Sequence, residues 1–325
     1  MTTELDSAQN LHKIDPLFRE KCNLILHEWQ EGDLPYREAS KKLESFIVES
    51  KEDDNVAHEG GVHIIYGIIK AYRGDYEGSI QHFERANGFF QIAKNADRIL
   101  TCTLNIGETY RQMGSYAQAR IYFRKAYNQA KEINNSGTQC IAISNEGLMW
   151  LSLGNLELAL SCMQEGLNLS RNPWSDRSDD EVARKSHDCE VYHGLTMLKL
   201  KQNDYKSAWH YATQAYFIAE ELERPLRVGY ANRAMAEVIS VTGKALESGF
   251  DNDPDEYYLR AVHAFREMKA DAEVAHTIYA QGKSLSKRGK KDLAIRSFRK
   301  AMLIYSKLKM ISSAAKAAEA QVNVS

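Results

Sequence analysis

The feature that most constrains this chain is a turn sequence that recurs at a fixed spacing of 40 residues. Each clear copy holds a glycine and, five positions later, a serine or an alanine. Apolar residues with a helical period lie before and after each copy. A fixed period of this length is the signature of stacked supersecondary units, so we expect an array of helical hairpins. The three clearest copies are RGDYEGS at 73–79, MGSYAQA at 113–119 and LGNLELA at 153–159.

The spacing continues in both directions from these copies. Ala39 lies 40 residues before the small residue of the first copy, Ser79. Towards the C-terminus, Ala208 comes 49 residues after the third copy, and Ala294 comes a further 86 residues later. The second gap leaves room for one degenerate unit around Ala261. The pattern therefore predicts an all-α fold of about seven antiparallel helix pairs.

The same pattern predicts how the chain is divided. Residues 1–16 precede the first periodic segment and are expected to form a flexible N-terminal segment. Residues 17–310 form the helical repeat solenoid. Residues 311–325 contain the alanine-rich stretch SSAAKAAEA and are expected to form a C-terminal capping helix and tail.

Small residues at fixed places predict close contact within each hairpin. The first helices carry a glycine and the second helices a serine or alanine, as in the pairs Gly107 with Ala119 and Gly147 with Ala159. Two small residues on facing helices let the backbones approach, which offsets the roughly 1 kcal/mol that a glycine costs inside a helix. The other first-helix glycines are Gly67 and Gly282, and a large and a small apolar residue follow the second-helix position in Phe83 and Ala86, Phe123 and Ala126, and Phe298 and Ala301.

The turns themselves carry helix-ending and helix-starting residues. Glycine adopts the left-handed conformation that commonly ends a helix, and serine, aspartate and asparagine are good N-caps for the next one. The expected C-terminal glycines are Gly74, Gly114, Gly154 and Gly289, and the expected N-caps are Asp75, Ser115, Asn155 and Asp204.

Composition excludes several classes of protein. Lys and Arg total 42 against 44 Asp and Glu, so a net charge of −2 gives no overall field for nucleic acid or an anionic membrane. The N-terminal sequence lacks the features of a secretory signal, and no run approaches the roughly 18 apolar residues of a membrane span. Five scattered cysteines without a C-x-x-C pair favour reduced, mostly buried thiols and a cytoplasmic location.

Several of these residues together resemble the tetratricopeptide repeat, strongest over 61–171 and traceable over about 17–310. The matching residues are Gly107, Tyr110, Gly114, Tyr116, Ala119, Phe123 and Ala126. The period of 40 exceeds the family's usual 34, so the chain is similar to the longer-helix variety found in kinesin light chains, in bacterial transcriptional regulators and in peptide-sensing phosphatase regulators. The resemblance implies a right-handed superhelix whose first helices line a concave groove that binds peptides or partner proteins. It does not imply an enzyme.

The resemblance also implies which side chains face that groove. Asn105 and Asn145 occupy the same place one repeat apart, where an asparagine in long-helix members reads the backbone of an extended peptide. One amide can donate to a carbonyl and accept from an N–H at once. Alternatively, the polar groups only solvate an empty inner face. The predicted groove residues are Asn105, Glu108, Arg111, Gln112, Ser144, Asn145, Glu190, His193, Tyr230, Arg233 and Glu237, and further candidates are Thr101, Leu104, Ile141, Leu148, Leu151, Met197, His276, Tyr279, Lys283 and Lys287.

Two insertions and a charged end are further candidates for contacts. The stretch 171–187 predicts an exposed loop or a lengthened helix start, and 245–258 contains Asp253, Pro254 and Glu256, which favour an N-cap, a first helical residue and a capping-box acid. Both insertions are either contact loops or tolerated surface excursions. From 283 to 316, eleven Lys and Arg accompany the single acid Asp292. This basic hairpin is either a solvated end of the solenoid or a docking patch. A docking patch would bind an acidic protein segment or a nucleic-acid backbone.

One cluster bears on catalysis. SHDCEVYH at 186–193 places Cys189 and His193 within one helical turn, and His187, Glu190 and His193 at steps of three. The arrangement is not H-E-x-x-H and has no second cysteine nearby, so a buried thiol explains it better than a metal or a thiolate–imidazole pair. No nucleotide-binding motif is present, and a Ser/His/Asp set cannot be assembled from the sequence. We therefore expect no catalytic residues, no metal site and no cofactor.

Two functions remain open. In the first, the chain is a non-catalytic interaction protein or scaffold that holds a peptide-like segment of a partner in its groove. In the second, it is a regulatory sensor that binds a peptide or small ligand and controls a partner enzyme or transcription factor. An enzyme that uses Cys189 and His193 is a distant third. We expect a protein or peptide partner, no membrane and no nucleic acid, with residues 283–316 as a weak candidate for the latter.

Overall fold

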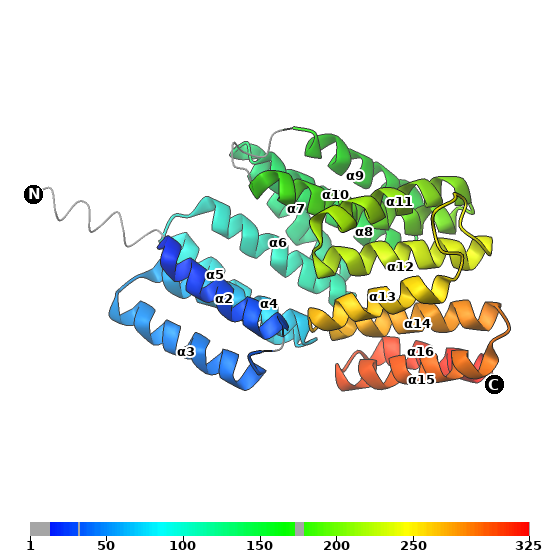
Figure 1. Cartoon of the computed structure of the whole chain (residues 1–325). Helices are drawn as coiled ribbons and strands as arrows, with labels where there is room; N and C mark the ends of the chain where they lie inside the picture. The colour runs from blue at the N-terminus through cyan, green and yellow to red at the C-terminus, as the bar shows by residue number, and fades with distance from the viewer. Residues whose placement is uncertain (1–13, 32, 173–178, 325) are drawn as a thin grey trace, which may run out of the picture. The chain divides into compact units, whose positions relative to one another are not determined.

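Regular structure in this protein is helical throughout the part of the chain that can be described. The computed structural model describes residues 14–31, 33–172 and 179–324. Over these ranges it contains fifteen α-helices and no strand. Consecutive helices pack in pairs (Figure 1). The predicted all-α fold of about seven antiparallel helix pairs is confirmed.

The chain divides into two compact units, of which the first covers residues 1–134. Its first pair packs against the start of the second through an apolar cluster that includes Trp29, Leu43 and Ile69. In this cluster the Tyr66 hydroxyl donates to the Ser40 carbonyl at 2.8 Å. The helices of this unit are α2 (Pro16–Glu31), α3 (Tyr36–Glu52), α4 (Val56–Tyr72), α5 (Tyr76–Ile92), α6 (Ala96–Met113) and α7 (Tyr116–Glu132).

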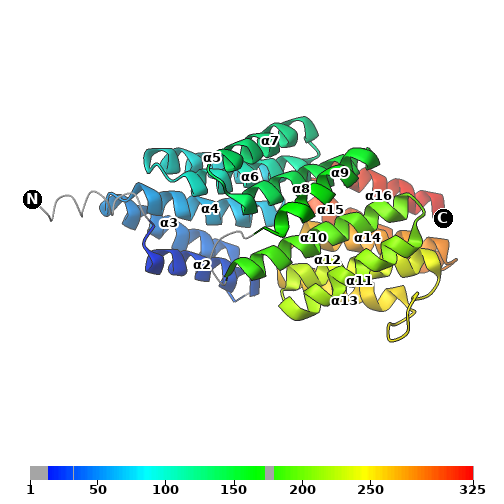
Figure 2. The ribbon, with the colours of Figure 1, turned by 90° about the horizontal axis from the view of Figure 1, so that it is seen from above.

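The second unit covers residues 135–325 and holds the remaining helices. Here α12 to α15 lie side by side in chain order (Figure 1), and Figure 2 views the same helices from above. The last helix, α16, packs against α15. The helices are α8 (Ser136–Leu153), α9 (Leu156–Ser170), α10 (Asp179–Lys201), α11 (Tyr205–Leu222), α12 (Pro225–Thr242), α13 (Pro254–Glu267), α14 (Asp271–Lys287), α15 (Lys291–Lys307) and α16 (Ile311–Val324).

The predicted turn chemistry is largely confirmed. Gly74, Gly114, Gly154 and Gly289 all have positive φ angles, between 75° and 81°, which suits glycine because it has no Cβ. The side chains of Asp75, Asn155 and Asp204 accept hydrogen bonds from the backbone of the following helix. Ser115 stands at the N-cap of α7, but its hydroxyl makes no capping bond.

The glycines of the first helices mainly leave space for a phenylalanine ring of the second helix. The small residue of the second helix is not their closest neighbour in most hairpins. A Cβ at Gly107 would lie 2.8 Å from the Phe123 ring, and one at Gly282 would lie 2.8 Å from the Phe298 ring. The nearest atoms to Gly107 belong to Phe123 and Tyr122, so the predicted direct contact of Gly107 with Ala119 is not the closest one. Gly147 does approach the Ala159 carbonyl, at 3.2 Å from the ideal Cβ position.

The unit around Ala261 is less degenerate than its sequence indicated. Ala261 is fully buried on α13, and a Cβ on Gly229 of α12 would lie 2.6 Å from the Phe265 ring. The glycine–phenylalanine contact therefore recurs here. The connection between α12 and α13 is longer than the other turns, so the spacing of the turns does not reveal this contact.

The insertion at 245–258 is anchored to the second unit. Phe250 packs edge-on against Trp209 with ring centroids 5.2 Å apart. Asp253 accepts from the backbone N–H of Asp255 and caps α13, as predicted. The Asp253 backbone N–H donates to the Asp251 carboxylate at 2.9 Å, so Asp251 accepts the bond that the predicted capping box gives to Glu256.

The other insertion and the N-terminal segment fall partly outside the described residues. Residues 1–13 and 173–178 are not described, and Pro173 is among them. Beyond this gap α10 has 23 residues, in keeping with a lengthened helix start in 171–187. The predicted division into 1–16, 17–310 and 311–325 stays a prediction.

Candidate functional site

In the second unit, an ion pair joins the predicted groove residue Glu190 to the next first helix. The Arg227 Nη1 on α12 donates to the Glu190 carboxylate on α10 at 2.7 Å, and the Arg227 Nε donates to the Ser186 hydroxyl at 2.9 Å. Burial alone would lower the pKa of Arg227, but the Glu190 carboxylate, with smaller contributions from Cys189 and Tyr230, outweighs it and raises that pKa. This pair links α10 to α12.

A second ion pair joins α12 to α14. The Arg233 Nη1 donates to the Glu273 carboxylate at 2.6 Å. Burial alone would lower the pKa of Arg233, but Glu273, Tyr230 and Glu237 together outweigh it and raise that pKa. Arg233 also lies over the Tyr230 ring, 5.2 Å from its centroid. Arg233 and Glu273 are 40 residues apart, which is one repeat. Opposite charges at this spacing are therefore a sequence pattern that could have predicted the ion pair.

His193 completes this surface, and its ring lies against Tyr230. The two ring centroids are 5.1 Å apart, and His193 is only 9% exposed. The structure therefore brings together five predicted residues on α10 and α12, and we call them, with Arg227 and Glu273, the first-helix face of the second unit. Its members are Glu190, His193, Tyr230, Arg233 and Glu237, together with Arg227 and Glu273, which the sequence analysis missed.

In the first unit, the predicted residues on α6 form a local polar cluster. The Glu108 carboxylate accepts from Arg111 at 2.6 and 2.7 Å and from the Gln112 amide at 3.0 Å. One turn before them, Asn105 is half-buried and makes no side-chain hydrogen bond to any described residue. Its amide is therefore available to a partner.

Asn145 and Ser144 of α8 have different surroundings. Asn145 is half-buried and, like Asn105, has no side-chain hydrogen bond within the described chain. Ser144 is 1% exposed, and its hydroxyl is hydrogen-bonded to His187 Nε2 at 2.9 Å. Ser144 thus lies inside the unit, between α8, α9 and α10, and we leave it out of the binding set.

Ser144 belongs to a buried cluster that the repeat pattern does not predict. His187 Nδ1 lies 3.0 Å from the Asp188 carboxylate, and its ring also contacts the Cys140 sulfur at 3.4 Å. The order Ser144, His187, Asp188 resembles a hydrolase triad, but Gly166 packs so closely on Ser144 that a single added Cβ would overlap its hydroxyl. Ser144 is only 1% exposed, so its hydroxyl is closed to a substrate, and its bond to His187 ties α10 to α8.

Cys189 has the surroundings of a structural thiol. It is fully buried, and its Sγ donates to the Ala215 carbonyl at 3.5 Å. Burial raises the pKa of Cys189 to about 12, with Glu190 and Asp188 adding to the rise against Arg227. A nucleophilic thiolate needs a lowered pKa, so these surroundings disfavour thiolate chemistry with His193.

The structure also bears on membrane insertion and on the charge of the basic hairpin. No helix in the described ranges has the length and apolar character needed to cross a bilayer. The acidic insertion meets the basic hairpin, since Arg288 Nη2 donates to the Asp255 carboxylate at 2.6 Å and Lys290 lies 3.3 Å from it. Part of the charge of residues 283–316 is therefore neutralised within the chain.

Comparison with known proteins agrees with this architecture. The tetratricopeptide repeat model matches residues 62–132 and 99–172. No curated protein matches the chain significantly in sequence. Over residues 62–172 the chain is therefore similar to tetratricopeptide repeats.

Solved structures resemble the chain in fold. The apo form of RapI superposes with a TM-score of 0.61 at 15% identity, covering 89% of this chain and 99% of that one. A Rap protein complexed with competence and sporulation factor gives 0.58 at 15% identity, over 86% and 78%. Aspartyl phosphate phosphatase F from Bacillus subtilis gives 0.52 at 14% identity, over 90% and 76%. At these identities the similarity is one of fold.

Proposed function

We propose that this chain is a non-catalytic interaction protein that binds a peptide-like segment of a partner on its first helices. Each unit offers its own residues for such binding. In the first unit they are Asn105 and its neighbours on α6, and in the second they are Asn145 on α8 and the first-helix face. The proposal has the support of one fold neighbour, a Rap protein solved with competence and sporulation factor. We propose no catalytic role, although another neighbour is named as a phosphatase.

The state of the two asparagines carries the proposal. Both amides are half-buried, and neither makes a side-chain hydrogen bond to the described chain. A half-buried amide without a partner is expected to gain free energy when a ligand supplies a donor and an acceptor. An extended peptide backbone supplies both. Asn105 would read such a backbone on the first unit and Asn145 on the second.

The charged residues of the second unit would then set specificity. Glu190 with Arg227 and Arg233 with Glu273 are paired within the chain, so a ligand does not have to neutralise them. Paired charges at an interface select partners with complementary charges and reject others. Tyr230, which is half-buried beside Arg233, offers an aromatic surface for an apolar side chain.

The regulatory alternative has a physical basis in the same ion pairs. Both pairs join neighbouring first helices, α10 with α12 and α12 with α14. A ligand that competes for Arg227 or Arg233 would change the contacts between hairpins and could pass that change to a partner enzyme or transcription factor. Solution scattering with and without the ligand distinguishes the two functions, since only the sensor is expected to change its dimensions.

Binding to the asparagines can be tested by replacing them with alanine and comparing the result with asparagine-to-alanine changes on second helices. We would capture the partner from the native cell, identify it by mass spectrometry and measure binding of its peptides by calorimetry. Asn105→Ala with Asn145→Ala should weaken binding by about 1 to 3 kcal/mol per site, because each loses a bridged backbone. Thermal stability should barely change.

The matched control is Asn128→Ala with Asn168→Ala. These asparagines are exposed, lie on the second helices α7 and α9, and are also 40 residues apart. The control should bind like the wild type. If both double variants bind like the wild type while Lys291→Glu with Arg299→Glu abolishes binding, the basic hairpin is the site and the proposed face is wrong.

A further inference from the structure

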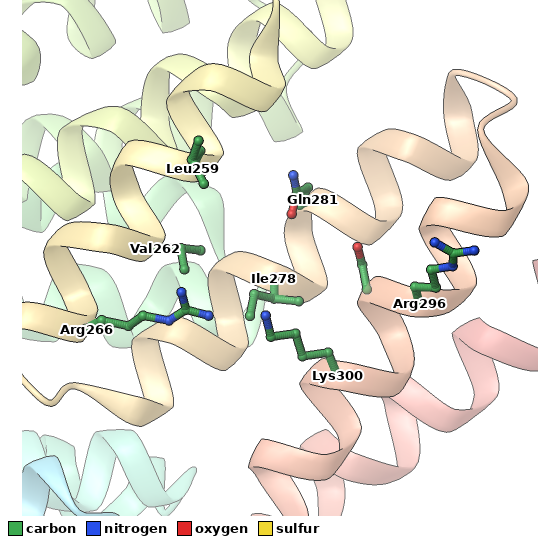
Figure 3. Close-up of a pocket in the computed structure, with 8 residues that line it drawn as sticks. Leu259, Val262, Arg266, Ile278, Gln281, Arg296 and Lys300 are labelled. Atoms are coloured by element: carbon green, nitrogen blue, oxygen red, sulfur yellow. The ribbon is translucent and has the colours of Figure 1, made fainter.

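A cleft in the second unit lies on its second helices rather than on the proposed peptide-binding face. It has a cavity volume of about 220 Å³ and is lined by α13, α14 and α15 (Figure 3). Helices α13 and α15 are the second helices of successive hairpins, and α14 contributes Ile278 and Gln281 between them. A site here therefore does not depend on Asn105 or Asn145.

The polar part of the cleft is cationic. Arg266 comes from α13, and Arg296 and Lys300 come from α15. None of the three makes an ion pair or a side-chain hydrogen bond to any residue in the described ranges. Figure 3 shows the side chains of Arg266 and Lys300 directed toward each other beside Ile278. Two cations that converge without a counter-ion repel each other, and an anion between them would remove this repulsion.

The acid that approaches this cleft is already neutralised. Asp255 lies 3.5 Å from the Gln281 amide, at the cleft lining. Its carboxylate is bound by Arg288 at 2.6 Å and by Lys290 at 3.3 Å. Those contacts outweigh burial and hold the pKa of Asp255 below its ordinary value, so its charge is committed to them. The charge on Arg266 and Lys300 is left for an external anion.

Apolar side chains form the rest of the cleft. Val262 and Ile278 are buried at its base, and Leu259 on α13 is 62% exposed beside them. Inorganic phosphate would satisfy the cations but leave Leu259 in water. An occupant that buries an apolar group next to its negative charge would use both features of the cleft.

We infer that this cleft binds a short acidic segment of a partner protein, with one carboxylate between Arg266 and Lys300 and an adjacent leucine-like side chain on Leu259, Val262 and Ile278. Guanidinium and ammonium groups both suit a carboxylate. The segment would occupy a second site, separate from the proposed peptide-binding face. One chain could then hold two partner segments at once.

The test uses the full chain and a fluorescein-labelled peptide of repeated Glu-Glu-Leu units, followed by fluorescence anisotropy. Arg266→Gln with Lys300→Gln should weaken binding by at least about tenfold, because the carboxylate loses both charged partners. Leu259→Ser should weaken it by a smaller, measurable factor, since this side chain is exposed and its loss should not disturb folding. A Glu-Glu-Ser peptide should bind more weakly than the Glu-Glu-Leu peptide.

The matched control is Lys291→Gln with Arg299→Gln, which removes the same charge from exposed positions of α15 outside the cleft. It should leave the affinity within about twofold of the wild type. The inference is wrong if this control weakens binding as much as the cleft variant, because the attraction would then be a general charge effect. It is also wrong if Leu259→Ser and the serine peptide change nothing and inorganic phosphate displaces the probe, because the cleft would then be a simple anion site.

Discussion

At the scale of single residues, one contact explains why glycine occurs inside these helices. Gly67, Gly107 and Gly282 each face the ring of the phenylalanine four positions after the small residue of the second helix. The closest approach of a Cβ to that ring would be 2.5 Å at Gly67 and 2.8 Å at the other two. The glycine thus lets a large ring into the hairpin, and burial of the ring offsets its low helix propensity.

This contact predicts opposite effects for the same substitution at two helical glycines. Gly107→Ala should destabilise the protein by roughly 1 to 3 kcal/mol, because the new methyl group overlaps the Phe123 ring. Gly88→Ala on α5 meets nothing within 4 Å and should stabilise by up to about 1 kcal/mol through helix propensity. Thermal or urea unfolding measures both. A Gly107→Ala protein as stable as Gly88→Ala would contradict the role given to the ring.

A second prediction at this scale concerns two neighbouring histidines of the first unit. His63 Nδ1 and His82 Nδ1 are 2.9 Å apart, and His63 is only 3% exposed. Burial lowers the pKa of each to about 4, and for His63 the neighbouring His82, Arg85 and Lys51 act in the same direction. Both rings are therefore neutral in the folded protein at pH 7.

The sign of the pH dependence follows from these lowered pKa values. The unfolded chain binds protons near pH 6.5 while the folded chain does not, so stability falls as the pH drops from about 6.5 towards 4. For His63 the loss between pH 7 and 4.5 should be about 2 kcal/mol. Unfolding of His63→Gln with His82→Gln should depend less on pH over this range. The control His263→Gln removes a histidine whose side chain is 75% exposed, and it should follow the wild-type profile.

At the scale of elements, the insertion before α13 connects one hairpin to the next. The Asp255 carboxylate at the start of α13 binds Arg288 and Lys290, which lie between α14 and α15. Glu256, the neighbouring residue that the sequence favoured as a capping acid, is exposed. The two acids therefore differ in role although they are adjacent.

Asp255→Asn should lower stability by about 1 kcal/mol at pH 7, because it removes a partly exposed charge from two cations. The lowered pKa of Asp255 means that its contribution is present above the ordinary aspartate pKa and is lost as the pH falls through its folded value. The difference between wild type and variant should therefore shrink in acid. Glu256→Gln is the control, and urea unfolding should show no change in its stability at pH 7 or in acid. A loss of stability equal to that of Asp255→Asn would mean that Glu256 is the capping acid after all.

What could be predicted from the sequence at this scale depends on how local the interaction is. The C-terminal glycines and most N-caps depend on backbone groups within a few residues, so they were predictable. Arg233 and Glu273 lie one repeat apart, within reach of a periodic argument. Ser144 and His187 are 43 residues apart across an insertion, and no period aligns them. The repeat pattern therefore places Ser144 in the groove, although this side chain is buried.

At the scale of the whole molecule, contacts are made mainly between neighbours in the chain. The helices of each unit pack with the next one or two helices, and the two units are each compact by themselves. In such an array stability is close to a sum of single repeats and their interfaces. A local defect should therefore loosen its own hairpin and the adjacent ones first.

Two equivalent substitutions, one in each unit, test this locality. Ala119 on α7 and Ala294 on α15 are both fully buried at the small position of the second helix. Ala119→Leu should overpack its hairpin and cost roughly 1 to 3 kcal/mol, and Ala294→Leu should do the same in its own unit. Hydrogen exchange should then show lost protection in α6 and α7 for the first variant and in α14 and α15 for the second. Each variant is the control for the other, because they carry the same chemical change. Equal loss of protection across both units in either variant would mean that the chain unfolds as one cooperative body, and the neighbour-by-neighbour account of its stability would be wrong.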